Sequence, residues 1–137
     1  GGAVHSVLIQ QGLLGIRHPA SMFFQSCRAT HGGGAMQIQS LVQNVGFIGF
    51  TDGSAAYGGC LEVYDAPTSD DTRHWSDYDW IHNWRGTATL SGTMEFDSCH
   101  AAGNGGAVLA ARSFKAKSSS RLSFRRCSAF AGGALHV

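Results

Sequence analysis

This 137-residue chain lacks several features that define common protein classes. Charged residues make up only 14% of it and the net charge is +1, so its composition gives no general attraction to nucleic acid or to a charged membrane surface. No apolar run reaches the roughly 18 residues that indicate a membrane-spanning helix. No segment of convincing length has helical periodicity either. These absences predict a β-rich protein that neither spans a membrane nor binds nucleic acid.

Motifs of several enzyme and metal-site classes are also missing. The four cysteines include no Cys-x-x-Cys pair, so zinc-ribbon and thioredoxin chemistry have no support. Neither His-Glu-x-x-His nor Gly-x-Ser-x-Gly occurs, and the seven histidines are scattered along the chain. The sequence therefore predicts a non-catalytic protein that needs no cofactor.

Glycine, in contrast, is abundant with 19 residues, and many of them belong to a motif that recurs four times. Each copy has a Phe, then Cys or Gly three residues later, and then a glycine pair followed by Ala or Cys and an apolar residue. The copies occupy residues 24–38, 50–63, 96–110 and 124–137. The defining residues are Phe24, Cys27, Gly33 and Gly34 in the first copy, Phe50, Gly58 and Gly59 in the second, Phe96, Cys99, Gly105 and Gly106 in the third, and Phe124, Cys127, Gly132 and Gly133 in the fourth.

Apolar residues alternate with other residues on both sides of each glycine pair. Met94 and Phe96 flank Glu95 before the turn, and Val108 and Ala110 flank Leu109 after it. A period of two is typical of a β-strand. Each copy should therefore hold two short strands, joined by a turn in which the glycines supply positive φ or close backbone approach.

Corresponding residues recur in the same order and on the same face in every copy. This recurrence predicts an all-β fold, a right-handed parallel β-helix or solenoid of about five coils. In-register stacking would place Phe on Phe, Cys on Cys and glycine pair on glycine pair, with Gln37, Glu62, Leu109 and His136 in one outward column. An antiparallel sandwich is the alternative, although its hairpins would reverse the order of corresponding residues.

The Phe-x-x-polar element and the Gly-Gly-Ala-aliphatic element resemble the repeats of the chlamydial polymorphic outer membrane proteins and related β-helix surface proteins. Repeats of that family carry Phe-x-x-Asn, whereas this chain has Cys27, Gly53, Cys99 and Cys127 at the position of the Asn. The resemblance covers most of the chain outside residues 65–92. It implies a β-helix, display at the cell surface and a role in adhesion.

One domain is expected, spanning residues 1–137. The chain begins within the motif at Gly1 and stops directly after an expected strand at Val137, which predicts a segment of a longer polypeptide. A β-helix segment of this kind has two open sheet edges. Other protein subunits, or further copies of the motif in the same polypeptide, are expected to stack on both ends.

A loop insertion at residues 65–86 separates the second and third copies. Loops on rigid scaffolds often carry function, and this one is rich in aromatic and acidic residues. It has three interpretations: a contact surface for a protein or a glycan, a set of aromatics that packs onto the coil, or a cation site. The candidate contact residues are Trp75, Trp80, Trp84, Tyr78, His74 and His82, and the weaker candidate metal ligands are Asp70, Asp71, Asp77 and Asp79.

Three cysteines occupy one position of the motif and should form an inward column. Adjacent coils would bring Cys99 and Cys127 within the Cα separation that a disulfide needs. In-register parallel strands seldom meet the dihedral requirement, so small buried thiols are the favoured interpretation for Cys27, Cys99 and Cys127. Cys60 takes the Ala position after its glycine pair and is expected to stand alone in its column.

These observations predict a structural or interaction module, a scaffold or adhesin within a larger protein or assembly. The alternative is a β-helix that binds or degrades polysaccharide, which needs carboxylates converging on one outward face. Acidic residues of the loop facing Glu62 or Glu95 would be required for that chemistry, and Asp77 and Asp79 are the ones to test by substitution. The sequence leaves the compartment open, and the resemblance favours the cell surface.

Overall fold

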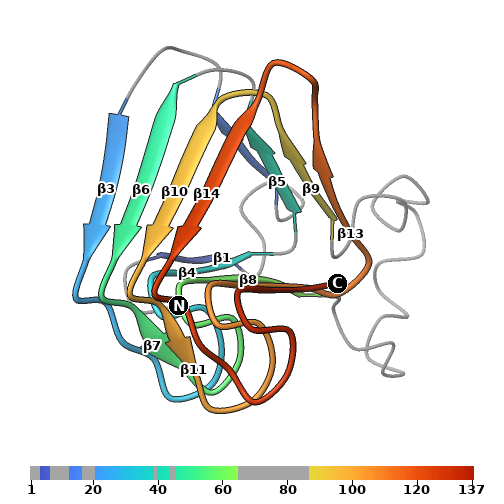
Figure 1. Ribbon diagram of the computed structural model, residues 1–137. Helices are drawn as coiled ribbons and strands as arrows, with labels where there is room; N and C mark the ends of the chain where they lie inside the picture. Colours follow the sequence, from blue (N-terminus) through green and yellow to red (C-terminus); the bar gives the residue numbers. More distant parts are fainter. Residues whose placement is uncertain (1–3, 7–12, 17–20, 39, 44–45, 65–86) are drawn as a thin grey trace.

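A computed structural model describes residues 4–6, 13–16, 21–38, 40–43, 46–64 and 87–137 (Figure 1). These ranges contain strands, turns and bends but no helix, so the all-β prediction is confirmed for them. Every strand pairing among them is parallel. The antiparallel sandwich is therefore wrong for this part of the chain, because hairpin-connected neighbours would pair antiparallel.

The strands that carry the motif Phe residues lie side by side in a four-stranded sheet, the Phe sheet. Phe24, Phe50, Phe96 and Phe124 occupy corresponding positions in it. Successive rings stack with centroid separations of 5.1, 4.8 and 5.2 Å. The expected stacking of Phe on Phe is thus confirmed. In order across the sheet, the strands are β3 (Ser21–Gln25), β6 (Phe47–Thr51), β10 (Thr93–Asp97) and β14 (Arg121–Arg125).

The strands that follow the glycine pairs form a five-stranded sheet. Gln37, Glu62, Leu109 and His136 lie opposite one another in succession, so the expected column of these residues exists. Within it, Gln37 Nε2 donates a hydrogen bond to Glu62 Oε2 at 2.7 Å. The strands in order are β1 (Val4–Ser6), β4 (Met36–Ile38), β8 (Leu61–Val63), β12 (Val108–Ala110) and β15 (Leu135–His136).

The structure contains two further sheets, whose strands are additional to the two strands per copy that the sequence predicts. One runs through the segments between motif copies, and the other joins two very short strands within the second and third copies. The first lies in segments outside the recurring motif, and the strands of the second are two residues long, so periodicity alone does not indicate either sheet. The first consists of β2 (Leu13–Ile16), β5 (Ser40–Gln43), β9 (Thr87–Leu90) and β13 (Ser113–Ala116), and the second of β7 (Ser54–Ala55) and β11 (His100–Ala101).

The chain visits the three larger sheets in the same order each time (Figure 1). From a strand of the five-stranded sheet it passes to the β2–β13 sheet, then to the Phe sheet, and then through the glycine-rich turn to the next strand. Inward-facing side chains of the sheets form one core, because alternate residues of β10 and β12 are buried. The largest fully buried side chains are Phe50, Phe96, Met36, Ile38, Ile48, Leu61, Leu90, Met94, Val63 and Val108.

Both roles expected of the glycine pairs occur in the turns. The first glycine of each pair has positive φ, as at Gly58 (54°) and Gly105 (65°). In the first three pairs the second glycine is confined by neighbouring backbone: a Cβ at Gly106 would lie 2.5 Å from the carbonyl oxygen of Ser128. Gly133, in the fourth pair, instead has open space and positive φ (46°). Conformational freedom explains the first glycine, and lack of space explains the second in the first three pairs.

Removing a ring from the Phe stack should destabilise the protein strongly. Phe96→Ala deletes a side chain that is 1% exposed and stacked on both sides, so we expect a loss of about 3–5 kcal/mol in the free energy of unfolding, measured by urea denaturation. Phe130→Ala is the matched control, because Phe130 is 90% exposed, and its loss should stay within about 0.5 kcal/mol. Equal losses in the two variants would contradict the stacked core.

The confinement of Gly106 can be separated from backbone strain. Gly106→Ala forces a Cβ against the next turn, whereas Gly133→Ala meets no atom within 4 Å and only has to hold φ at 46°. We expect about 1–2 kcal/mol of destabilisation at Gly133 from the left-handed backbone alone, and a larger loss at Gly106. Thermal denaturation of the two variants measures the difference, and the reverse order would contradict the close approach.

Candidate functional site

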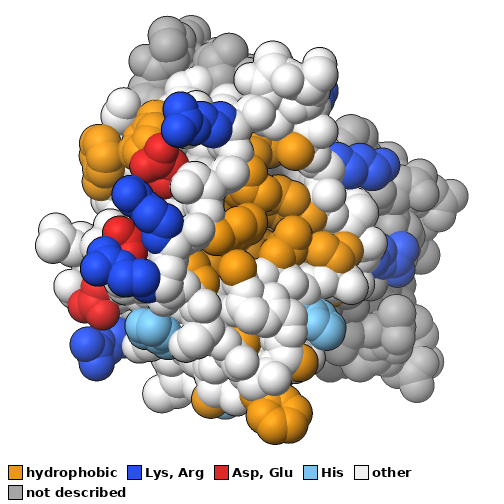
Figure 2. Space-filling model, viewed as in Figure 1, with side chains coloured by type: hydrophobic (Ala, Val, Ile, Leu, Met, Phe, Trp, Pro, Cys, Tyr) orange, Lys and Arg blue, Asp and Glu red, His pale blue; other side chains and the backbone are white. Residues whose placement is uncertain are grey.

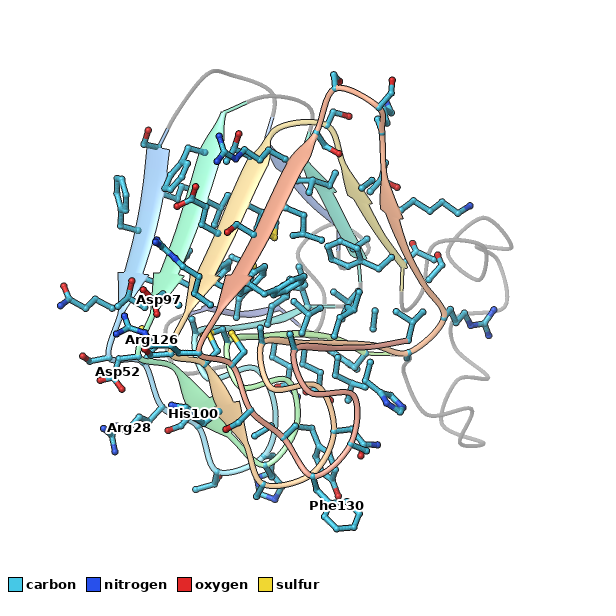
Figure 3. The ribbon with its side chains drawn as sticks, in the orientation of Figure 1. Arg28, Asp52, Asp97, His100, Arg126 and Phe130 are labelled. Carbon is cyan, nitrogen blue, oxygen red and sulfur yellow. A yellow bond between two sulfur atoms is a disulfide. The ribbon has the colours of Figure 1, made fainter. Side chains whose placement is uncertain are left out.

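A column of polar side chains follows the turn in which the strands of the Phe sheet end. The residue directly after each of these strands adopts a left-handed backbone although none of the four is glycine. Ser26, Asp52, Ser98 and Arg126 have φ between 51° and 56°. This conformation is uncommon for residues with a side chain. Figure 3 shows Asp52, Asp97 and Arg126 grouped at this edge, with Arg28 and His100 below them.

The strongest contact in this column joins the third and fourth copies of the motif. Arg126 Nε donates to Asp97 Oδ1 at 2.9 Å and Arg126 Nη2 donates to Asp97 Oδ2 at 2.8 Å. A bidentate guanidinium–carboxylate contact combines charge with fixed geometry. Together with a hydrogen bond from Ser98, it holds the pKa of Asp97 below its usual value, and the carboxylate raises the pKa of Arg126. Asp97 therefore stays ionised, which makes it a poor general acid.

The same column holds two weaker polar contacts. Ser26 Oγ donates to Asp52 Oδ2 at 3.0 Å, and an Arg28 nitrogen lies 4.0 Å from that oxygen. His100 Nδ1 and Ser128 Oγ are 2.8 Å apart. A serine nucleophile needs a histidine that a third group orients. The Asp97 carboxylate, which lies in the same column, accepts from Arg126 and Ser98. The Asp97–Arg126 and His100–Ser128 contacts connect the third copy to the fourth.

The bonding of the cysteines, which follow the polar column in each motif copy, differs from the expected free thiols. The structure contains a disulfide between Cys60 and Cys99, with a Cα–Cα separation of 5.7 Å, while Cys27 and Cys127 are free thiols. Cys60 has Ala35 and Ala107 on either side at its own motif position, as expected, but it bonds to Cys99 from a different motif position. The prediction that Cys99 is a free thiol is therefore wrong. Cys27 and Cys127 are free thiols as expected, but they are half-buried rather than buried.

Gly53 explains why Cys60 reaches Cys99. Gly53 occupies the motif position that holds Cys in the other three copies, and a Cβ there would collide with the Cys60 sulfur. The Cys60 side chain thus fills the space that Gly53 leaves and approaches Cys99 in the next copy. The sequence contains the signal for this bond, because the second copy exchanges Cys for Gly at one position and Ala for Cys at another.

The fourth copy presents a second surface of interest, the end surface, which consists of β14, β15 and the turn between them. Figure 2 shows apolar side chains gathered in the middle of this view, with basic and acidic side chains along one margin. Leu122 and Phe124 are half-buried, whereas their counterparts Met94 and Phe96 in β10 are at most 1% exposed. Phe130 and Val137 are exposed.

The candidate contact residues of the loop at 65–86 lie outside the described residues. The same holds for the four candidate aspartate ligands within it. The motif residues do come together as described above, from the Phe stack to the glycine turns. Within the described ranges, no three His, Cys, Asp or Glu side chains are grouped closely enough to hold a metal ion, and no helix there is suited to cross a membrane.

Comparison with known proteins gives no relative: no family model, no curated protein and no solved structure matches this chain. The function therefore has to be inferred from the described residues themselves.

The Asp97–Arg126 pair should make a pH-dependent contribution to stability. Because the pKa of Asp97 is lowered on folding, this contribution is present above the ordinary carboxyl pKa of 3.8 and is lost as the pH falls through the lowered value. Asp97→Asn should melt below the parent at neutral pH, and the two melting temperatures should converge in acid, once the pH lies below the lowered pKa of Asp97.

Asp52→Asn is the matched control for this measurement. It removes a carboxylate from the same column without breaking a bidentate pair, so its effect at neutral pH should be smaller. A difference between Asp97→Asn and the parent that does not change with pH would contradict the role of the charge.

Proposed function

We propose that the chain forms a right-handed parallel β-helix and acts as a structural and interaction module within a larger protein or assembly. The first part is supported by parallel pairing, by the register of the motif copies and by the repeated order of the sheets. Handedness follows from the general rule for parallel crossover connections. About five coils then stack along one axis, with the loop at 65–86 as an insertion.

The single observation that carries the interaction role is the loss of burial at the end surface. Leu135 in β15 is half-buried although its counterpart Val108 in β12 is fully buried, and the same contrast separates Phe124 from Phe96. β14 and β15 are also the last strands of their sheets among the described residues. Such strands offer unpaired backbone groups beside apolar side chains, which is the arrangement that binds an added strand.

The basic residues at the margin of the end surface indicate which side chains a partner strand would carry there. Arg121 and Arg125 lie at the two ends of β14, and Asp97 of β10 lies opposite Arg125 on the side that is already paired. A partner strand that repeats this pattern, with apolar residues over Leu122 and Phe124 and a carboxylate beside Arg125, is complementary to the surface. Another subunit, or a further copy of the motif, has this chemistry.

Polysaccharide degradation receives less support from the described residues. The Asp97 carboxylate is held ionised by Arg126, and the Asp52 carboxylate accepts from Ser26. The Asp97 arrangement therefore does not provide the protonated acid that glycoside cleavage requires. Adhesion and display at the cell surface belong to the proposal as uses of the same interaction module.

A synthetic peptide of residues 93–110, with serine at position 99, is a suitable probe of the end surface. It carries the Phe96 strand and the strand after the glycine pair, so it imitates one added copy of the motif. We expect saturable binding to the 137-residue protein, measured by fluorescence anisotropy. In the register of β10 on β14, Asp97 lies opposite Arg125, whereas Thr93 lies opposite Arg121. Arg125→Glu should therefore weaken this binding about two- to fivefold at low salt, and added salt should reduce the difference.

Lys117→Glu is the control for that experiment, because it changes the net charge equally but lies outside β14. Its affinity for the peptide should equal that of the parent. Absence of binding by the parent, or equal weakening by the two variants, would overturn the role of the end surface.

A further inference from the structure

The sulfur atoms of three cysteines point the same way from one motif position. Each lies near the carbonyl oxygen two residues earlier in the chain, at 3.5 Å for Cys27, 3.8 Å for Cys99 and 3.2 Å for Cys127. Strand pairing on both sides of the turn places these positions in register, because Phe24, Phe96 and Phe124 correspond before it and the residues after Cys99 and Cys127 form a bridge. The three sulfurs therefore lie along one line.

Cys60 adds a fourth sulfur to this line. The vacant position between Cys27 and Cys99 belongs to Gly53, and the Cys60 sulfur occupies the space of the missing side chain. The order along the column is thus Cys27, Cys60, Cys99 and Cys127, with the disulfide in the middle and a free thiol at each end. A free thiol beside a disulfide is the arrangement from which exchange proceeds.

We propose that this sulfur column is a thiol–disulfide exchange site, in which either end thiol can take over one partner of the Cys60–Cys99 disulfide. In one direction, the Cys127 thiolate attacks the Cys99 sulfur. The Cys99–Cys127 bond forms, the Cys60–Cys99 bond breaks, and Cys60 leaves as a thiolate that takes up the proton Cys127 released. In the other, Cys27 attacks Cys60 and Cys99 leaves. No oxidant or reductant is consumed.

The position of Cys127 favours the first direction. Its sulfur lies 3.9 Å from the carbonyl oxygen of Phe96, which belongs to the neighbouring strand that leads to Cys99. Both end thiols are only half-buried, whereas Cys60 and Cys99 are at most 1% exposed. External reagents therefore have better access to the two thiols that start the exchange than to the disulfide itself.

The exchange moves a covalent link from one pair of motif copies to the next. In the observed arrangement the disulfide joins the second copy to the third. A Cys99–Cys127 bond instead joins the third copy to the fourth, which carries β14 and β15. A cross-link there restrains the last strands of the two sheets, so the exchange would tie down or release the surface that the proposed function uses. The exchange site itself rests only on the cysteines.

Thiolate formation sets the rate of exchange. Burial raises the pKa of Cys127, and the nearby Asp97 carboxylate acts in the same direction, although hydrogen bonds from the backbone oppose both. Asp97 in turn contacts Arg125 and Arg126. Exchange should therefore be slow at neutral pH. While the pH is below the thiol pKa, its rate should rise roughly tenfold for each unit by which the pH increases, because the thiolate is the attacking species.

Trypsin, which cleaves after Lys and Arg, releases each cysteine on its own peptide: residues 18–28, 29–73, 86–112 and 127–137. The native protein would be incubated at about pH 7 and about pH 9, its free thiols blocked with a maleimide, and the disulfide-linked peptides identified by mass spectrometry. We expect the native pair alone at first. The neighbouring pairs Cys99–Cys127 and Cys27–Cys60 should then appear, faster at the higher pH.

Three serine variants separate the two directions. Cys127→Ser should abolish the Cys99–Cys127 pair and keep the Cys27–Cys60 pair, and Cys27→Ser should do the reverse. The double variant should retain only the native disulfide, which also shows that it folds. Protein denatured in guanidinium, as a reference, should give pairs between all cysteines.

Two results would overturn the proposal. One is a native disulfide that stays the sole pair after prolonged incubation at about pH 9. The other is the appearance of non-neighbouring pairs, such as Cys27–Cys127, in the native protein as readily as in the denatured reference. Neither result affects peptide binding at the end surface, so failure of the exchange site and failure of the proposed function can be told apart.

Discussion

In-register parallel pairing is the constraint on which the other features of this chain depend. Because each strand of the Phe sheet starts at the same point relative to its neighbour, Phe24, Phe50, Phe96 and Phe124 stack ring on ring at about 5 Å. The same register places one glycine turn on the next, where backbone approaches so closely that a Cβ does not fit. A shift by one residue would turn the apolar residues of a strand outward and separate the glycine turns at once, so one register is strongly favoured.

Stacking like residues on one another creates difficulties that the chain avoids locally. A column of charged residues of one sign would repel along its length. In the polar column, Asp97 instead contacts Arg126, and Asp52 contacts Ser26 and Arg28 of the first copy. A column of four identical Cys side chains is likewise interrupted, because Gly53 leaves a space that Cys60 enters from another position. The disulfide thus connects different motif positions in adjacent copies and has a Cα–Cα separation of 5.7 Å, within the range that suits such a bond.

The regularity that stabilises the middle of the structure is also what makes the end surface a candidate for interaction. Interior copies bury their apolar residues because a similar copy lies on each side. The fourth copy has the same residue types at β14 and β15 but is covered on one side only in the described structure, so Leu122, Phe124 and Leu135 retain exposed area. A surface of this kind is complementary to another copy of the motif, because the interior copies pack against one another through the same residue types. We therefore propose a stacking partner for it. The adjoining sulfur column would connect that surface to thiol chemistry.

The sequence by itself determined the strands around each motif, their parallel alignment and the roles of the glycine pairs, because alternation with a period of two and recurrence in the same order leave few other arrangements. It also indicated the columns of Phe24 and Gln37. Only the tertiary structure decided the remaining sheets, since short strands such as β9 and β13 are stabilised by their neighbours rather than by a strong pattern of their own. The Cys60–Cys99 bond and the Asp97–Arg126 pair were decided at the same level. Both join residues that are far apart in sequence and at different motif positions, so their proximity depends on the path of the turn once the copies have stacked. The disulfide depends in addition on the space left by Gly53.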